Sequence, residues 1–494
     1  MRFRGIAAIA AASFFALGGQ ALAENVSFEG EVLSEAPWDV ADDSTASGGK
    51  ALRMSNRTWV TRTVTTGAPS YWISVRAKGK RCVTDAQIAV RVDDVEVYRG
   101  PVRDGMWDLA EGELDSLPRG PHSVIVQFTN PGRELIGTPL ECGRDVLVDR
   151  VTIHAPFADD SFRNEPLSDS APLDPSSGSI VAALQDQIGD ADARVSNSGN
   201  GAYVMTRTFS TPVYIVPEEQ PPVDVWVNGA WAVQQQLTGA PLPPDARPAD
   251  PKDNPATPAD ESGDMNLILY QPSTDTIWEF WQLRRNNPEP APPNWHAGWG
   301  GRITNVSQNP GYFTYHEPPH YSFGASASRL SMLAGLQRIA ELERGEIDHA
   351  VDMCIPNVRT NFWVWPAQFS DDPNTELTDS TPIAEGTRFR LPASYAIPST
   401  LPRYTRTLLA AIKRYGLVVR DRGSNACFYA EDPSPLSGED PYNEGGNDPQ
   451  NGGIFAGAWP NLSGLLRDFP WSQLQVVAVP PGSDTGPFTF RMSP

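Results

Sequence analysis

The sequence predicts a mainly β protein, in which a β-sandwich is followed by a β-rich α+β region with two or three helices. Short runs of alternating apolar and polar residues recur between residues 71 and 151, separated by turn residues. Pro (47), Gly (41) and Trp (14) are abundant, which suits turn-rich β domains better than a helical bundle. Apolar residues at helical spacing predict helices over 331–344 and 401–415, the second ending at Gly416.

A length of 494 residues predicts two or three domains. We expect an all-β domain over 24–156 and a Ser/Asp/Pro-rich linker over 157–180. A second β-rich domain, with a predicted catalytic role, is expected over 181–494. Within it, the Pro-rich stretch 240–262 is expected to be a surface loop without a packed role.

Individual strands follow from the alternation of apolar residues and from the turn residues around them. The first domain is expected to have strands at 71–76, 87–92, 123–128 and 146–151. In the second domain, Pro272, Ser273 and Thr274 predict the turn of a hairpin between 265–270 and 276–285. The other expected strands there are 202–209, 213–216, 223–227, 349–355, 417–420 and 426–429.

The N-terminal segment has the pattern of a secretory signal peptide. Arg2 and Arg4 precede the apolar run 6–17, and 21–23 supplies an A-x-A cleavage site, so cleavage is expected near Ala23. An uncleaved anchor is the alternative. No later run of 18 apolar residues follows. We therefore expect a secreted protein, extracellular or periplasmic, without a membrane span and monomeric in its mature form.

The formal charge is −21, which argues against nucleic acid or an anionic membrane surface as a partner, because both require a basic surface. The even number of cysteines in an exported chain predicts disulfides. Four cysteines allow three pairings; one pair in each predicted domain favours Cys82–Cys142 and Cys354–Cys427. Free thiols are the alternative.

Four ordered segments of the first domain carry a family resemblance: 28–31 (FEGE), 46–51 (ASGGKA), 120–130 (GPHSVIVQFTN) and 144–149 (RDVLVD). Together they resemble the calcium-dependent β-jelly-roll carbohydrate-binding modules. The resemblance implies a jelly roll that binds carbohydrate and holds a structural calcium ion.

By the same resemblance, Glu29, Glu31 and Asp149 would be the calcium ligands. Carboxylate oxygens are the ligands that Ca²⁺ prefers, although two solvated acids on an edge strand are the alternative for the glutamates. Pro131 follows Asn130, where some relatives have an acid that binds a sugar-contacting calcium. We therefore expect sugar recognition by aromatic faces, with Trp107 as the candidate in the first domain.

The central part of the second domain resembles an exported bacterial protein family of unassigned function. The residues that carry the resemblance are 324–330, 345–350, 363–367, 386–391 and 416–421. The resemblance implies one continuous domain and no particular activity.

Glu279 is the candidate catalytic acid or nucleophile, because it lies between Trp278 and Trp281 on a predicted strand. An apolar environment raises the pKa of a glutamate towards that of a general acid, and indole rings form sugar subsites. Trp295 and Trp299 are further candidates for carbohydrate binding. The alternative for Glu279 is a structural ion pair with Arg284 or Arg285.

A second set of catalytic candidates comprises His349 and the loop residues His316, His320 and Tyr321. His/Tyr pairs serve polysaccharide lyases as base and acid; a structural role for His349 and an ordinary loop role for the other three are the favoured alternatives. The spacing of the histidines matches no zinc motif, and serine-hydrolase, zinc-peptidase, P-loop and dinucleotide-binding motifs are absent from the sequence.

These observations favour an exported polysaccharide-degrading enzyme, a glycoside hydrolase with an appended carbohydrate-binding module. Its expected partner is a polysaccharide or a cell-surface glycan, and its expected cofactor is structural calcium. The alternatives are a polysaccharide lyase and a non-catalytic carbohydrate-binding protein.

Overall fold

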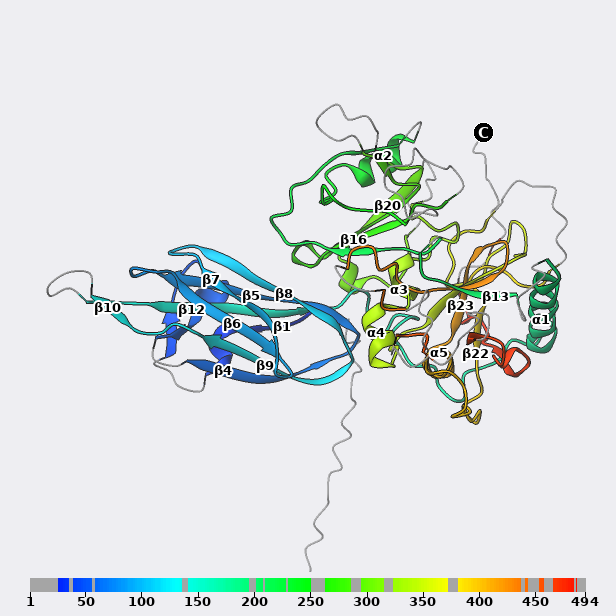
Figure 1. Ribbon diagram of the computed structural model, residues 1–494, viewed down its shortest axis with the longest axis horizontal. Helices are drawn as coiled ribbons and strands as arrows, with labels where there is room; N and C mark the ends of the chain where they lie inside the picture. The colour runs from blue at the N-terminus through cyan, green and yellow to red at the C-terminus, as the bar shows by residue number, and fades with distance from the viewer. Residues whose placement is uncertain are drawn as a thin grey trace, which may run out of the picture.

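The computed structural model describes residues 25–34, 39–55, 58–135, 141–194, 201–207, 209–227, 230–249, 263–285, 295–314, 323–371, 381–436, 440–442, 453–456, 465–483 and 486. These residues form 25 strands and five α-helices, which confirms the mainly β prediction. Figure 1 shows an elongated β-sandwich beside a broader body that contains all five helices. The predicted signal peptide lies outside the described residues.

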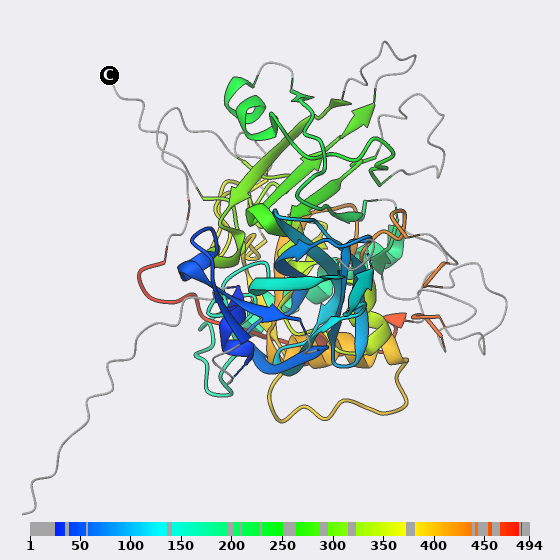
Figure 2. The same cartoon turned by 90° about the vertical axis from the view of Figure 1, so that its left-hand side faces the viewer.

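The sandwich consists of two antiparallel sheets (Figure 2). Along β9, His122, Val124, Val126 and Phe128 are buried, because alternate side chains of a strand point to the same face. One sheet has the order β2-β3-β12-β5-β8, with β1 paired to β12, and the other has the order β4-β9-β6-β7. The strands are β1 (Val26–Glu29), β2 (Val40–Asp42), β3 (Lys50–Met54), β4 (Trp59–Thr66), β5 (Ser70–Lys80), β6 (Ala86–Val92), β7 (Val95–Val102), β8 (Trp107–Leu117), β9 (Gly120–Phe128) and β12 (Asp145–His154), with the small hairpin β10 (Arg133–Leu135) and β11 (Glu141–Gly143).

The rest of the chain, after the sandwich, is referred to as the second part. A six-stranded mixed sheet forms its centre. Its order is β13-β24-β21-β23-β22-β25, and β21 and β23 are parallel neighbours. The strands are β13 (Ala202–Met205), β21 (Val351–Ile355), β22 (Arg388–Arg390), β23 (Leu417–Arg422), β24 (Ala426–Tyr429) and β25 (Gln475–Val476).

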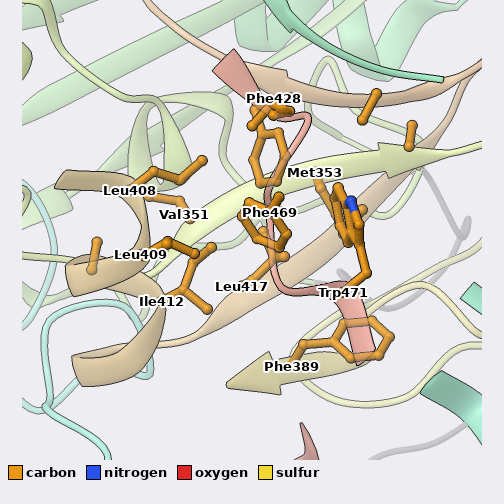
Figure 3. Close-up of a cluster of buried hydrophobic side chains, with 14 of the residues drawn as sticks. Val351, Met353, Phe389, Leu408, Leu409, Ile412, Leu417, Phe428, Phe469 and Trp471 are labelled. Carbon is orange, nitrogen blue, oxygen red and sulfur yellow. The ribbon is translucent and has the colours of Figure 1, made fainter. Parts of the chain in front are cut away.

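One face of this sheet is covered by helix α5 (Arg403–Arg414). Figure 3 shows Leu408, Leu409 and Ile412 of α5 packed with Val351 and Leu417 of the sheet. All five side chains are fully buried, and burying each contributes about 2 kcal/mol. Helix α1 (Ser177–Arg194), which the sequence did not predict, joins the same core.

A four-stranded sheet, β14-β16-β17-β20, forms a second layer together with helix α2 (Trp231–Leu237). Its strands are β14 (Val213–Ile215), β16 (Leu267–Gln271), β17 (Thr276–Trp281) and β20 (Trp299–Thr304). The predicted hairpin is confirmed, since a 3₁₀ turn at Pro272–Thr274 joins β16 to β17. A small sheet completes this region, with strands β15 (Val225–Trp226), β18 (Arg284–Arg285) and β19 (Trp295–His296).

The helix predicted over 331–344 is broken into α3 (Met332–Gly335) and α4 (Ile339–Arg344). Between them, the Gln337 backbone pairs with Tyr429 and Glu431 beside β24. The strand-like pairing therefore overrides the helical periodicity of the sequence. The second predicted helix ends as expected, with Gly416 at φ 100° after α5.

The sandwich packs directly onto the second part of the chain. Residues 157–164, the first part of the expected linker, are largely buried, and Arg163 is fully enclosed. Across the contact, Ser116 Oγ donates a hydrogen bond to Glu341 (3.3 Å). The Arg338 guanidinium lies 4.6 Å from the centre of the Tyr71 ring. The connection between the two parts is therefore a packed segment at its start.

Two further expectations can be compared with the structure. The disulfides Cys82–Cys142 and Cys354–Cys427 are both present, which confirms the favoured pairing. Within the expected surface loop 240–262, Ala240, Leu242 and Ala249 are buried, so residues 240–249 do pack; residues 250–262 lie outside the described part.

Among the described residues, no helix is both long and apolar enough to cross a membrane.

Candidate functional site

Three acidic side chains of the second part converge at one place. Asp421 lies near the end of β23, Glu385 precedes β22, and Asp371 lies in the loop between β21 and β22. One carboxylate oxygen from each lies within 4.8 Å of the other two, and no other such group of acidic, His or Cys residues occurs in the described chain. We refer to Asp371, Glu385 and Asp421 as the carboxyl cluster.

Backbone amides orient the carboxyl cluster. Arg422 N donates hydrogen bonds to Asp421 Oδ1 (3.0 Å) and to Asp371 Oδ2 (3.3 Å). Asp371 N donates to Glu385 Oε2 (2.7 Å). The other Glu385 oxygen, Oε1, is buried and has no hydrogen-bond partner. Each carboxyl group is thus held by a hydrogen bond to one of its oxygens. The second oxygen of Glu385 is buried without a hydrogen bond.

The cluster concentrates negative charge in a poorly solvated place. Two ionised carboxylates within 4.8 Å of each other repel each other by at least roughly 3 kcal/mol at an effective dielectric constant of about 20. Burial, together with the charges of Asp371 and Asp421, raises the pKa of Glu385 well above its usual value. Burial and Asp371 likewise raise the pKa of Asp421, although Arg420 opposes this. The repulsion can be relieved by a shared proton or by a bound cation.

Buried ion pairs lie near the carboxyl cluster. The Arg163 guanidinium lies 2.6 Å from Asp352, and Arg420 lies 3.7 Å from the same carboxylate. Arg420 stacks 3.6 Å from the centre of the Tyr429 ring. Burial lowers the pKa of Arg420, but Tyr429 and the acids Asp352 and Asp421 raise it overall. Arg420 therefore stays charged beside the cluster.

The sequence analysis did not single out the carboxyl cluster. Its members are separated by 14 and 36 residues and match no spacing motif. One feature of the sequence could have indicated the cluster: Asp421 follows the apolar strand residues 417–419. Ligand sites tend to lie at the carboxyl ends of parallel strands.

Glu279 has a different environment from the one expected. Its carboxylate is fully buried and accepts hydrogen bonds from Ser331 Oγ (2.6 Å), Met332 N (3.0 Å) and Leu333 N (3.2 Å). Burial raises the pKa of Glu279 above the usual value, as expected from the sequence, although these hydrogen bonds oppose the shift. Neither Arg284 nor Arg285 is among the partners described for Glu279. The carboxylate thus caps the first turn of α3, and solvent does not reach it.

His349 is also buried, next to the contact between the sandwich and the second part. Its Nε2 lies 3.2 Å from Glu341 Oε2, and its Nδ1 lies 3.0 Å from the Ala350 carbonyl oxygen. Burial opposes protonation, but attraction to Glu341 outweighs it and raises the pKa of His349. The other lyase candidates, His316, His320 and Tyr321, lie outside the described residues.

The candidate sugar-stacking residues fall into two groups. Trp278 and Trp295 belong to the apolar core around the four-stranded sheet and are 5% and 2% exposed. Trp107, Trp281 and Trp299 are half-buried. Trp281 Nε1 donates a hydrogen bond to Asp264 (3.2 Å), and the charge of Asp264 acts on Asp421.

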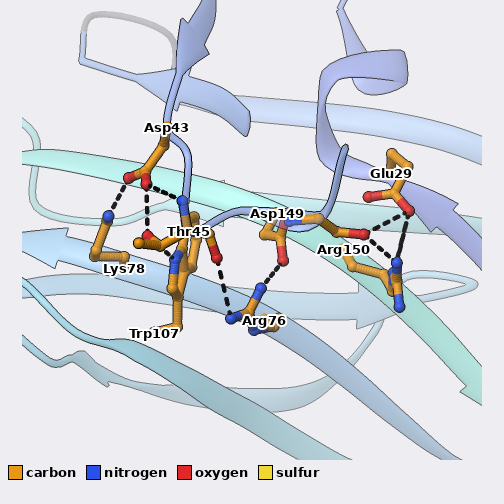
Figure 4. A network of polar contacts seen from close by, with 9 residues as sticks. Glu29, Asp43, Thr45, Arg76, Lys78, Trp107, Asp149 and Arg150 are labelled. Atoms are coloured by element: carbon orange, nitrogen blue, oxygen red, sulfur yellow. Dashed lines mark hydrogen bonds and ion pairs between the residues drawn. The ribbon is translucent and has the colours of Figure 1, made fainter. Parts of the chain in front are cut away.

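Segments from three of the sequence motifs meet in the sandwich (Figure 4). Ser47 N donates to Asp149 Oδ1 (2.7 Å), and Ser47 Oγ donates to Glu29 Oε1 (3.1 Å). Arg76 pairs with Asp149, and Arg150 lies 2.8 Å from Glu29. The proposed calcium ligands Glu29 and Asp149 are therefore connected through one serine.

The fit of a calcium ion to this place rests on two unsatisfied oxygens. Glu29 Oε2 and Glu31 Oε2 are buried without a hydrogen-bond partner, as expected for cation ligands. Both Asp149 and Glu29 are also paired with an arginine, Arg76 and Arg150 respectively. Glu29, Glu31 and Asp149 do not converge as the carboxyl cluster does, so the free oxygens of the two glutamates are the part of the expected ligand set that fits a cation.

Trp107 lies at one end of this polar network (Figure 4). Its Nε1 donates to Thr45 Oγ1 (2.9 Å), and Arg76 and Lys78 lie 4.9 Å and 4.6 Å from its ring centre. The indole is thus fixed in position and remains half-exposed. A fixed aromatic face bordered by hydrogen-bonding groups is suited to a polar, ring-shaped ligand.

Comparison with known proteins gives short structural overlaps. No family model matches the chain, and no curated protein matches it. A carbohydrate-binding module CBM36, solved with calcium and xylotriose, is 16% identical over 26% of this chain and 98% of its own, at a TM-score of 0.20. A CBM36-1 domain of a multidomain xylanase, from the hindgut metagenome of Trinervitermes trinervoides, is 12% identical over 27% of this chain and 98% of its own, with the same score of 0.20. An exo-β-1,3-galactanase from Phanerochaete chrysosporium is 19% identical over 27% of this chain and 30% of its own, at a TM-score of 0.19.

Proposed function

We propose that this chain is an exported carbohydrate-active protein that binds a polysaccharide through its sandwich and cleaves glycosidic bonds in its second part. The observation that carries the proposal is the meeting of Glu29, Ser47 and Asp149, which come from three separate motifs of the carbohydrate-binding-module resemblance. A chance resemblance in sequence gives no reason for residues so far apart to be hydrogen-bonded to one another.

Trp107 is the proposed sugar platform, and Glu29 and Glu31 are the proposed ligands of a structural calcium ion. The indole is held by Thr45, Arg76 and Lys78, so little conformational entropy is lost when a sugar ring stacks on it. The calcium ion would stabilise the loop that carries Ser47, without contacting the sugar.

The carboxyl cluster is the proposed reaction centre of the second part. Cleavage of a glycosidic bond requires acidic groups at one place, because positive charge develops on the sugar ring in the transition state. Asp371 and Asp421 are half-buried, so a substrate can reach them, in contrast to Glu279. Of the tryptophans predicted to bind sugar, Trp281 is proposed as a subsite wall, since it is half-buried and hydrogen-bonded to Asp264.

The test is to incubate the purified mature protein with a panel of polysaccharides. Depletion of the protein by insoluble polysaccharide measures binding, and new reducing ends measure hydrolysis. Ultraviolet absorbance of unsaturated products would instead identify a lyase. We expect new reducing ends without unsaturated products for at least one polysaccharide.

Matched variants separate the two parts of the proposal. Trp107→Ala should weaken binding by about tenfold, equivalent to about 1.4 kcal/mol. Trp59→Ala, at a 56% exposed tryptophan of the other sheet, should leave binding unchanged. Asp421→Asn should abolish hydrolysis, whereas Glu343→Gln, at an exposed acid, should not. If insoluble polysaccharide removes the protein from solution but neither reducing ends nor unsaturated products form, only the binding part of the proposal stands.

A further inference from the structure

The carboxyl cluster has the composition of a site for a hard cation. All its side-chain ligands are oxygens, with no imidazole or thiolate among them, and oxygen-only sites select Ca²⁺, Mg²⁺ or Mn²⁺ rather than zinc. The proximity of three acids would not by itself define a site, since acidic groups often lie close together without an ion.

The second observation is the unsatisfied oxygen of Glu385. Glu385 is fully buried, its Oε2 accepts the amide of Asp371, and its Oε1 has no partner. A buried carboxylate oxygen without a hydrogen bond is costly. A cation bound between Glu385, Asp371 and Asp421 would satisfy it.

The hydrogen bonds around the cluster have the arrangement of an outer coordination layer. The amide of Arg422 contacts both Asp371 and Asp421, and the amide of Asp371 contacts Glu385. Such bonds fix the orientation of metal-ligating carboxylates. Since Asp371 and Asp421 are half-buried, water can complete the coordination.

We infer that Asp371, Glu385 and Asp421 bind one hard divalent cation, at a site separate from the proposed calcium site of the sandwich. The inference concerns binding only and stands or falls independently of the polysaccharide-cleaving function.

The experiment counts ions bound to the full mature chain. After treatment with EDTA and its removal, equilibrium dialysis against Ca²⁺, Mg²⁺ or Mn²⁺ gives the number of ions and their affinities. The parent should bind the cluster ion with a dissociation constant of about 10⁻⁵ to 10⁻³ M. Glu385→Gln should bind one ion fewer per chain than the parent. Glu343→Gln, at an exposed acid outside both proposed sites, should bind as many ions as the parent.

A second variant keeps the experiment decisive if Glu385→Gln does not fold. Asp371→Asn alters a half-buried ligand and should weaken binding of the same ion at least tenfold. Near-ultraviolet circular dichroism checks the folding of each variant. The inference is overturned if the folded variants bind as many ions as the parent, with equal affinity. A polysaccharide assay on the same variants is separate: loss of the ion with unchanged hydrolysis would count against the reaction centre and not against the cation site.

Discussion

Arg338 of the second part of the chain stacks on Tyr71 of the sandwich and forms an ion pair with Glu431 at 2.8 Å. Both members of the ion pair are more than nine-tenths buried. One guanidinium thus joins the sandwich, helix α4 and the segment that follows β24.

The first prediction concerns this guanidinium. Arg338→Met should destabilise the protein by about 3–5 kcal/mol, because it leaves Glu431 buried without its charge partner. Urea unfolding of the full chain measures the change. Arg406→Met, at an exposed arginine of α5, is the control and should change the stability by less than about 0.5 kcal/mol. Similar unfolding curves for the two variants would show that the contact contributes little.

The second prediction concerns pH and the buried His154, which is hydrogen-bonded to Ser74 through Nε2 at 2.8 Å. Burial lowers the pKa of His154 from 6.5 to about 4. Between these two pH values the unfolded chain binds a proton that the folded chain does not. Stability should therefore fall as the pH drops below 6.5, by about 3 kcal/mol in total at pH 4.

The variant His154→Gln isolates this contribution. Glutamine can keep the hydrogen bond to Ser74 but does not titrate, so the variant should lose less stability than the parent between pH 6.5 and pH 4. Melting temperatures measured across this range test the difference. Parallel pH profiles for variant and parent would contradict the assignment.

The third prediction separates a structural from a catalytic role for Glu279. Glu279→Gln should destabilise the protein by about 1–3 kcal/mol, since it weakens three buried hydrogen bonds at the start of α3. Ser331→Ala removes one of these bonds without changing the carboxylate and serves as the control. If Glu279 is structural, both folded variants should keep the parent turnover. A loss of several orders of magnitude in Glu279→Gln alone would restore it as a catalytic residue.

The fourth prediction concerns calcium and the sandwich. Calcium should raise the melting temperature of the Glu385→Gln variant, and a chelator should lower it, because the sandwich ion binds the folded state. Adding Glu31→Gln to that variant should remove the shift. An unchanged melting temperature in Glu385→Gln would mean that Arg76 and Arg150 supply the positive charge at Glu29 and Asp149 without a cation.

Local signals explain what the sequence predicted well. The hairpin around Pro272–Thr274 and the helix before Gly416 depend on turn residues and periodicity that act over a few positions. The break at Gln337 and the hydrogen bonds of Glu279 depend on partners more than 50 residues away. The members of the carboxyl cluster are 14 and 36 residues apart and come together only after β22 and β23 have paired in the sheet.

Helix α1 shows a different limit. The expected linker reached residue 180, but α1 begins at Ser177, and the segment before it is rich in Ser, Asp and Pro. That composition is typical of a flexible connection. Nothing local reveals that Phe162 and Arg163, at the other end of the same segment, are buried against the second part.

The burial of residues 157–164 also determines how the two parts can cooperate. A flexible tether would let the sandwich sweep a volume around the second part and set only a local concentration. A packed connection instead holds Trp107 and the carboxyl cluster at a constant separation and orientation. If the proposed function holds, a polysaccharide bound at Trp107 would reach the carboxyl cluster at a fixed number of sugar units from Trp107, and the protein would release fragments of a preferred length.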